Sequence, residues 1–295
     1  MFKNTMKTTV LLAALGGLIV GVAGILGGGS STALTIGLGL AFVMVGGSYW
    51  FSDKLALASA RAKVIERNDH PEFYDMVASL SQRAGLPMPR VAVSPSAQPN
   101  AFATGRGPNH AVVCATQGLL DSMPRHEVEG VMAHELMHVK HRDILIGSVA
   151  AAIATAISYI ANMAMFASMF GGGSSDDEDR PNPMAMLMMA LLAPIAASLI
   201  QMAVSRSREF EADRGAAELL GSGHALADAL ERIEVLAART PMNVAPAQAQ
   251  AYIHNPLNEL KTGKSAGMAR MFSTHPATEE RIARLRAMST TPALA

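Results

Sequence analysis

The chain of 295 residues has a single cysteine, few aromatic residues and few charged ones. Because Cys114 has no second cysteine to pair with, the chain can form neither an internal disulfide nor a cysteine-rich zinc module. We expect its thiol to be buried and inert. Charged residues make up only 16% of the chain, whereas about a quarter is usual in a soluble protein. The composition is therefore that of a protein with a large apolar portion.

The two signs of charge balance, with 24 Lys and Arg against 24 Asp and Glu. A neutral chain has no overall electrostatic attraction for nucleic acid. The sequence also lacks the stripe of aromatic and basic residues on which exposed bases stack. Nucleic acid is therefore not expected as a partner.

Charge is missing altogether between Lys7 and Asp53, a segment that residues 27–32, rich in Gly and Ser, divide in two. The apolar run on each side is long enough to cross a bilayer as a helix. A cleavable signal peptide is the alternative for the first run. A second full-length run follows at once, so we expect an uncleaved transmembrane hairpin over residues 1–51.

A second pair of uncharged runs covers residues 144–170 and 184–204, joined by a Gly-rich and acidic loop over residues 171–183. Both runs can span a membrane, the first with tilt or overhang. The alternative is a buried helical hairpin in a soluble protein, but soluble cores seldom run this far without a charge. The sequence thus predicts about four transmembrane helices.

Positive residues beside these runs indicate the orientation. Ten of them fall on one side of a four-span arrangement, and Arg180 alone falls on the other. The positive-inside rule makes the richer side cytoplasmic. Both termini and the soluble segments 52–143 and 205–295 are then expected in the cytoplasm. The ten residues are Lys3, Lys7, Lys54, Arg61, Lys63, Arg67, Lys140, Arg142, Arg206 and Arg208.

The two soluble segments show regular patterns. Helical periodicity indicates helices at residues 72–84, 206–220, 224–237 and 276–288. Three short runs, which we expect to form a small antiparallel sheet, lie at residues 90–93, 100–105 and 111–113. The charged residues from Asp53 to Asp69 also fall at helical spacing among Leu55, Leu57 and Val64. Residues 240–273 show neither helical nor strand periodicity and are long for a loop. Loops of this length are often lids or mobile segments, which we expect here.

The run His134-Glu-Leu-Met-His138 carries the first chemical signal, on a helix that we expect to begin near Pro124. Residues four apart on a helix lie about 40° apart around its axis, so the two imidazoles face one point and form half a zinc site. Glu135 points about 100° away and can reach a metal-held water without being a ligand, as a general base does. A pair of surface or core-edge histidines is the alternative.

A third ligand is expected on a later helix. Glu209 and Asp213 are four apart and share a face, whereas Glu211 lies roughly 160° from Glu209. We assign the metal to Glu209, because Asp213 one turn later can accept the second N–H of a ligand histidine. The alternative is a set of surface carboxylates that pair with Arg206 and Arg208.

Four segments together resemble the HtpX family of bacterial membrane-integrated zinc metalloproteases, which is related to the CAAX prenyl proteases with an H-E-x-x-H helix. They follow the family's order at residues 100–105 (NAFATG), 134–138 (HELMH), 205–213 (SRSREFEAD) and 273–282 (STHPATEERI). The resemblance implies an α-helical membrane protein with a cytoplasmic protease domain. That domain would have a mostly helical, α+β, zincin-like (gluzincin) fold with a small β-sheet.

The resemblance also implies residue roles. His134, His138 and Glu209 would hold one Zn²⁺ per subunit and Glu135 would be catalytic, in agreement with the helical-face reasoning. His275, which precedes a proline, is the candidate donor to the oxyanion, with a capping or packing histidine as the alternative. One more segment resembles the edge strand along which such proteases lay an extended substrate: Asn100, Ala101, Phe102, Ala103 and Thr104.

The activity implied is that of an endopeptidase in the bacterial inner membrane, acting on misfolded membrane proteins in quality control and stress response. Its partners would be membrane or unfolded polypeptides and the lipid bilayer. One alternative is a CAAX-type protease for prenylated peptides, although four spans enclose little volume for that task. The other is a non-catalytic membrane scaffold with a structural zinc, which would not require Glu135.

Overall fold

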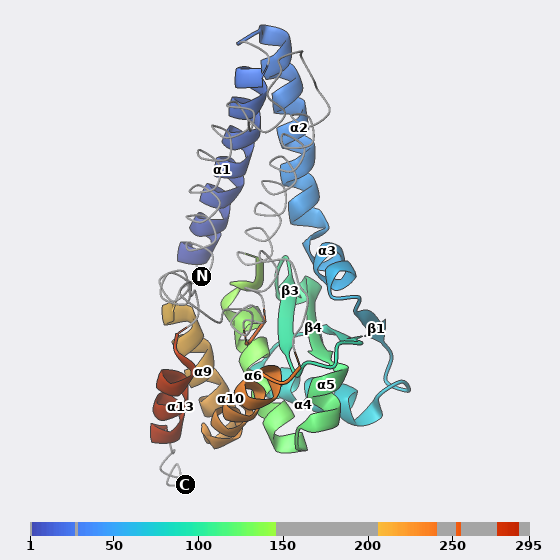
Figure 1. Cartoon of the computed structure of the whole chain (residues 1–295), viewed down its shortest axis with the longest axis vertical. Coiled ribbons are helices and arrows are strands. Elements are labelled where there is room, and N and C mark those ends of the chain that lie inside the picture. Colours follow the sequence, from blue (N-terminus) through green and yellow to red (C-terminus); the bar gives the residue numbers. More distant parts are fainter. Residues whose placement is uncertain (1, 27–28, 146–205, 241–251, 255–275, 289–295) are drawn as a thin grey trace, which may run out of the picture.

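The computed structural model describes residues 2–26, 29–145, 206–240, 252–254 and 276–288 (Figure 1). Four sequence-based expectations lie wholly or almost wholly outside the described residues: the second pair of apolar runs, the acidic loop 171–183, the segment 240–273 and His275. The elements of the described chain are α1 (Phe2–Leu26), α2 (Ser31–Trp50), α3 (Ser52–Ser59), β1 (Lys63–Ile65), α4 (Pro71–Ala84), β2 (Arg90–Ser94), β3 (Ala101–Gly105), η1 (Pro108–His110), β4 (Ala111–Thr116), α5 (Gln117–Ser122), α6 (Arg125–His141), α9 (Arg206–Leu220), α10 (His224–Ala237) and α13 (Thr278–Ala287).

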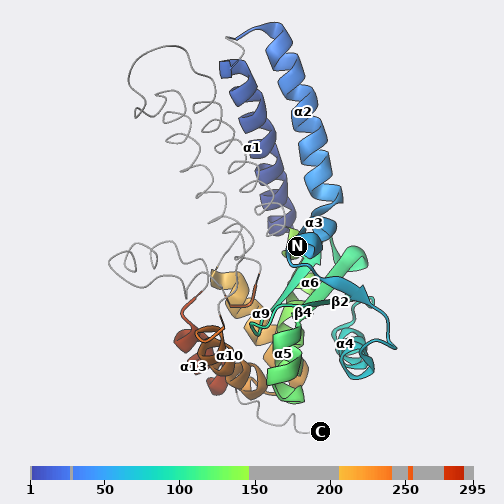
Figure 2. The same cartoon turned by 45° about the vertical axis from the view of Figure 1, so that its right-hand side comes forward.

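Helices α1 and α2 form a hairpin that stands out from the rest of the described chain (Figures 1 and 2). Ser30 caps the start of α2, where its hydroxyl accepts a hydrogen bond from the Ala33 amide at 3.2 Å. The helices approach so closely at Gly37 that an added Cβ would lie 2.6 Å from the Cβ of Ala23. Several large apolar side chains of α2 are exposed, namely Ile36, Leu38, Leu40, Phe42 and Val43. The hairpin therefore presents an apolar surface outward.

The predicted transmembrane hairpin of residues 1–51 corresponds to α1 and α2. Judged by length and mean hydropathy, no single helix of the described chain qualifies as a membrane span. The helical segments Ser31–Gly47 and Ser52–Ser59 qualify together, across a bend of 72°.

Four strands form one sheet in the order β1-β2-β4-β3. Strand β1 pairs antiparallel with β2, and β3 with β4, but β2 and β4 run parallel. The expectation of a wholly antiparallel sheet is therefore wrong. Pro95 and Pro99 interrupt the connection after β2 and prevent a tight hairpin there. After β2 the chain instead forms β3 at the edge of the sheet, one strand position away from β2. Strand β4 then fills the position between β2 and β3.

The first soluble residues are less helical than their charge pattern predicts. Helix α3 ends at Ser59, and Arg61 adopts a left-handed conformation with φ of 51°. The chain then forms β1, which includes Val64 and pairs with β2. A strand of three residues is too short to show the period of two that identifies strands in a sequence.

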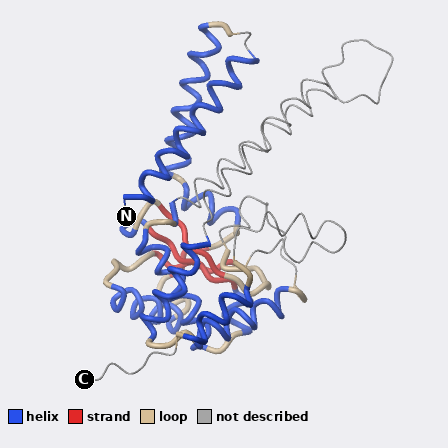
Figure 3. Tube along the Cα trace, turned by 90° about the vertical axis from the view of Figure 1, so that its left-hand side faces the viewer, coloured by secondary structure: helices blue, strands red, loops and turns tan. Residues whose placement is uncertain are grey.

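The sheet separates two groups of buried side chains, with helices packed around it (Figure 3). One face packs on α4 and α6 through Val91, Val113 and Ala103. The other face is covered by α3 and by Tyr252, and it contains Cys114. This cysteine is fully buried, as predicted, and burial raises the pKa of its thiol.

Helix α6 packs against α4, α9, α10 and the edge strand β3. It begins after Pro124, as predicted, and its buried Glu127 accepts two hydrogen bonds from Arg232 of α10, at 2.7 and 2.8 Å. The other predicted helices are confirmed within two residues as α4, α9, α10 and α13. Neighbours on several sides therefore fix the position of α6 and of the side chains it carries.

Candidate metal centre

Helix α6 carries His134 and His138 one turn apart, both at the end that leads to Arg142. Their Nε2 atoms lie 3.1 Å apart. His134 is fully buried, and the side chain of His138 is 17% exposed. The two imidazoles therefore face one point, and solvent reaches that point from the His138 side.

Helix α9 brings Glu209 to the same point. Its carboxylate oxygens lie 3.7 Å from Nε2 of His134 and 3.6 Å from Nε2 of His138. The three potential ligand atoms lie within 4.8 Å of one another, so these residues could hold a metal ion. Glu211, on the same helix, is exposed.

Each imidazole is oriented by its own carboxylate, in addition to Glu209. Nδ1 of His134 lies 2.9 Å from Asp213, and Nδ1 of His138 lies 3.1 Å from Asp143. Because an ionised carboxylate only accepts hydrogen bonds, each Nδ1 carries a proton, and each Nε2 of the neutral rings is left to act as a ligand on the inner side. Two ring nitrogens that face each other at 3.1 Å need a cation between them, either a proton or a metal ion, so the donor set fits a metal.

The protonation of the histidines agrees with this account. Burial lowers the pKa of His134, which favours the neutral imidazole that a ligand must be. Burial also disfavours a charge on His138, but the carboxylates of Asp143, Glu209 and Glu135 outweigh it and raise its pKa to about 10. A proton is thus held where a metal cation would lie, and metal binding must displace it.

Asp213 is held in turn by Arg281 of α13. The guanidinium donates to both carboxylate oxygens, at 2.9 and 2.7 Å, and both side chains are almost completely buried. Burial alone would raise the pKa of Asp213, but Arg281 and His134 lower it to about 2. Asp213 therefore stays ionised and keeps the ring of His134 in place.

Glu135 lies beside the cluster and is 3% exposed. Burial raises the pKa of its carboxyl, with a further contribution from Glu209, and the opposing effect of His138 leaves it at about 7. The backbone N–H of Ala103 donates a hydrogen bond to this carboxylate. Glu135 thus lies between the cluster and the edge strand, with a proton affinity suited to exchange near neutral pH.

Strand β3 presents half of its backbone groups outward. The Asn100 carbonyl accepts a hydrogen bond from the Thr116 amide at 2.9 Å, at the end of β4. Because antiparallel pairing alternates, the backbone groups of Ala101, Ala103 and Gly105 face the other way, towards the edge. An extended peptide could pair there.

The chain itself covers the beginning of this edge. The Ala101 carbonyl accepts from the Ile253 amide at 3.0 Å. The Asn100 side chain donates to the His254 carbonyl at 2.8 Å and accepts from the His254 amide at 3.2 Å. Of the predicted substrate residues, Asn100 and Ala101 are thus engaged by residues 252–254, and Phe102 stacks edge-on against Tyr252 at 5.1 Å. The edge beyond them, around Ala103, is the part nearest Glu135.

Two neighbours of the cluster were not identified from the sequence. Asp143 follows the end of α6, five residues after His138, and Arg281 occupies the buried face of α13. The position of Asp143 just after the histidine pair was a signal in the sequence that its carboxylate could orient one of the two imidazoles. An arginine on the inward face of a short amphipathic helix was a signal for Arg281, because a buried cation needs a buried anion. His275 lies outside the described residues.

Comparison with known proteins identifies the family. The model of peptidase family M48 matches residues 68–289. The chain belongs to peptidase family M48. Curated relatives include the "Protease HtpX homolog" of Ralstonia nicotianae, 52% identical, and that of Burkholderia thailandensis, 51% identical, each over 98% of both chains. Among solved structures, the chain is similar to S. mikatae Ste24p, with 21% identity and a TM-score of 0.47 over 96% of this chain and 65% of that one.

Membership of M48 makes the chain a metalloprotease. The resemblance to HtpX proteases, noted in four segments of the sequence, is confirmed along nearly the whole chain. The matched region includes the candidate ligands on α6 and α9 and the residues that orient them, namely Asp143 after α6, Asp213 on α9 and Arg281 on α13.

The helix faces predict which glutamate of α9 binds the metal. Glu209→Ala should lose the metal and the activity, because one of three ligand groups is gone. Glu211→Ala, a matched change on the exposed side of the same helix, should keep both. Elemental analysis of metal per chain in the detergent-purified variants checks this, and the reverse pattern would show that the cluster is assigned to the wrong residue.

Proposed function

We propose that the chain is a membrane-integrated, zinc-dependent endopeptidase that cleaves membrane or unfolded polypeptides. The observation that carries this proposal is the position of Glu135. Its carboxylate lies beside the cluster of His134, His138 and Glu209 and against the outward Ala103 amide of β3. From there it can reach both a water at the metal and a peptide laid along the strand.

Zinc suits this donor set. It prefers four-coordinate sites with nitrogen and oxygen ligands, and three protein ligands leave one position open. Bound there, it would lower the pKa of a water molecule and polarise the carbonyl of the scissile bond. His134, His138 and Glu209 would hold it, while Asp213 and Asp143 keep the two imidazoles turned inward.

The proton transfers fall to Glu135. It takes the proton of the attacking water and then delivers it to the leaving amine, and a pKa of about 7 allows both steps. A donor to the developing oxyanion is also required. His275, which the sequence places before Pro276, remains our candidate for that role.

The edge strand suggests how substrate is bound. Because the Ala103 amide donates to Glu135, a peptide would pair with the outward Ala103 carbonyl and would run directly past Glu135. Main-chain pairing makes few demands on side chains, so it gives affinity for many sequences. Such tolerance suits an enzyme that removes misfolded or damaged membrane proteins, which we propose as its role.

The membrane location is supported by the hairpin of α1 and α2, whose exposed side chains include Ile36 and Phe42. We propose that residues 1–51 and 144–204 lie in the bacterial inner membrane. Residues 52–143 and 205–295 would then form the protease domain, on the cytoplasmic side that the ten-to-one distribution of basic residues indicates. In the sequence, helices α6 and α9, which carry the candidate ligands, come directly before and directly after the second apolar pair.

Substitutions at Glu135 and His138 separate the base from a ligand. Glu135→Gln leaves the three ligands in place but removes the proton acceptor, so activity should fall by ~10²–10⁴-fold or more while zinc stays bound. His138→Ala removes a ligand, so zinc and activity should fall together. Zinc stoichiometry and cleavage of casein by the detergent-purified variants check this. A fully active, zinc-loaded Glu135→Gln would show that the proton acceptor is another group.

Reporter fusions test the topology. Fusions after Gly28 and after Ser175 should report the periplasm, and fusions after Arg67 and at the C-terminus should report the cytoplasm. The expectation follows from the distribution of basic residues beside the apolar runs. A cytoplasmic signal from the Ser175 fusion would mean that the second apolar pair does not span the membrane.

A further inference from the structure

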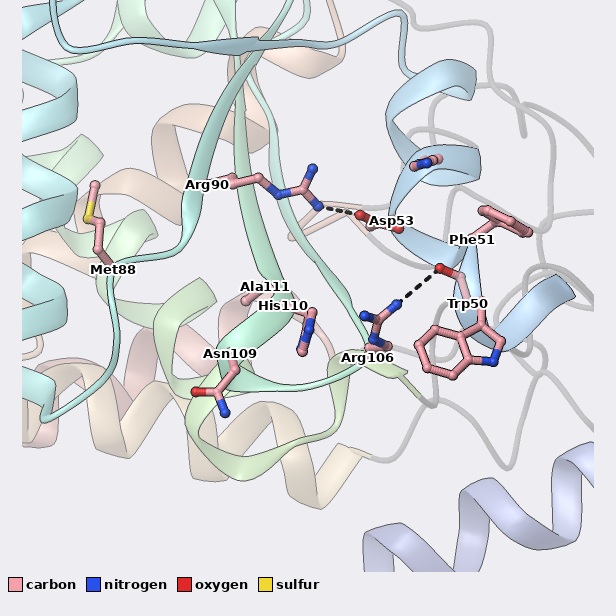
Figure 4. A pocket seen from close by; sticks show the side chains of 10 residues that line it. Trp50, Phe51, Asp53, Met88, Arg90, Arg106, Asn109, His110 and Ala111 are labelled. Atoms are coloured by element: carbon pink, nitrogen blue, oxygen red, sulfur yellow. Dashed lines mark hydrogen bonds and ion pairs between the residues drawn. The ribbon is translucent and has the colours of Figure 1, made fainter. Parts of the chain in front are cut away.

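A hollow of about 490 Å³ lies at the foot of α2, within the ~300–1,000 Å³ typical of small-molecule sites. Four segments line it: the end of α2, the start of α3, the chain leading into β2, and the connection between β3 and β4 (Figure 4). None of the candidate metal ligands is among its lining residues. It is therefore separate from the centre described above.

The hollow carries an excess of positive charge. Its lining includes Lys54, Arg90 and Arg106 but only one carboxylate, Asp53. Arg90 forms an ion pair with Asp53. Among the described residues, no carboxylate pairs with Lys54 or Arg106, so two positive charges face the hollow without a counter-ion.

Aromatic rings hold these two cations in place. The guanidinium of Arg106 lies 4.3 Å from the centroid of the Trp50 ring and donates to the Trp50 carbonyl at 3.4 Å. The ammonium of Lys54 lies 5.3 Å from the centroid of the Phe51 ring. Stacking of this kind restricts a long side chain before any ligand arrives, which reduces the entropy lost on binding.

The position of the hollow at the end of α2 indicates that it lies at the level of the membrane interface. Trp50 and Phe51 are 56% and 52% exposed and lie at the end of a helix whose large exposed apolar side chains include Ile36 and Phe42. Aromatic residues at the end of an apolar helix mark the level of the membrane interface. Phosphate groups of lipids lie at that level, where Lys and Arg side chains reach them.

We propose that this hollow binds the phosphate group of an anionic phospholipid from the leaflet that surrounds the foot of α2. The proposal rests on the membrane location proposed above. The planar guanidinium of Arg106 suits the oxygens of a phosphate, and Lys54 adds a second charge. Because Arg106 lies in the connection between β3 and β4, a bound headgroup also ties the edge strand to the membrane surface.

The single tryptophan of the chain makes the site directly observable, because Trp50 lies in its lining. Full-length protein in neutral detergent is titrated with short-chain phosphatidylglycerol, with phosphatidylcholine of the same chain length, and with inorganic phosphate. Trp50 emission should respond saturably to phosphatidylglycerol, at concentrations at least about tenfold below those of the other two compounds. Equal midpoints for both lipids, or an equal midpoint for inorganic phosphate, would overturn the proposal.

A pair of double variants separates the hollow from general surface charge. K54Q/R106Q should weaken the response to phosphatidylglycerol by about 30-fold, since each basic residue near a lipid surface contributes several-fold to binding. K63Q/R125Q removes the same charge from exposed positions outside the hollow and should match the wild type. If both variants weaken binding equally, diffuse attraction explains the result and the site does not exist.

Should K54Q/R106Q fail to fold, the single variant K54Q takes its place, because it retains the contact of Arg106 with Trp50. K54Q should weaken binding of phosphatidylglycerol about fivefold. An unchanged midpoint would overturn the proposal.

Membrane extraction distinguishes this proposal from the function on which it rests. If alkaline carbonate releases the wild-type protein from membranes, the membrane location itself is wrong. If the protein stays in the membrane fraction and Trp50 shows no saturable response to phosphatidylglycerol, only the headgroup site is wrong.

Discussion

The buried ion pair between Arg281 and Asp213 is the interaction on which the rest of the metal centre depends. It joins α13 to α9, and Asp213 continues the connection to His134 on α6. Removing one partner would leave a buried charge alone, at a cost of about 3–5 kcal/mol, so the three helices are strongly held in this one arrangement. The same guanidinium donates to the carbonyl of Ile253 at 3.4 Å, and the amide of Ile253 pairs with β3 through the Ala101 carbonyl. The orientation of a ligand and the shape of the edge strand are thereby coupled.

Much of the candidate site could be predicted from the sequence because it lies on helices. The helical period alone places His134 and His138 on one face of α6, and Glu209 and Asp213 on one face of α9, before any tertiary contact is known. The structure brings these faces together as that reasoning requires. Arg281 could not be assigned in this way, because its role depends on where α13 packs against α9, and that is set by the whole core.

The sheet shows the limit of local patterns more clearly. The prolines Pro95 and Pro99 were visible in the sequence, but the order β1-β2-β4-β3 follows from how the chain crosses to reach an edge next to α6. The engagement of Asn100 by His254 joins residues far apart in the chain, which no periodicity can indicate. Helices α4, α9, α10 and α13 were found correctly because each has enough turns to repeat its apolar face.

The proposed activity depends on one zinc ion held by two imidazoles and a carboxylate beside Glu135. X-ray absorption at the zinc edge, measured on the full-length protein purified in detergent, tests this most directly. We predict one zinc per chain with two imidazole nitrogens at ~2.0–2.1 Å, the remaining ligands being oxygens at similar distances. A sulfur ligand at ~2.3 Å, or a site with fewer than two imidazoles, would contradict the account.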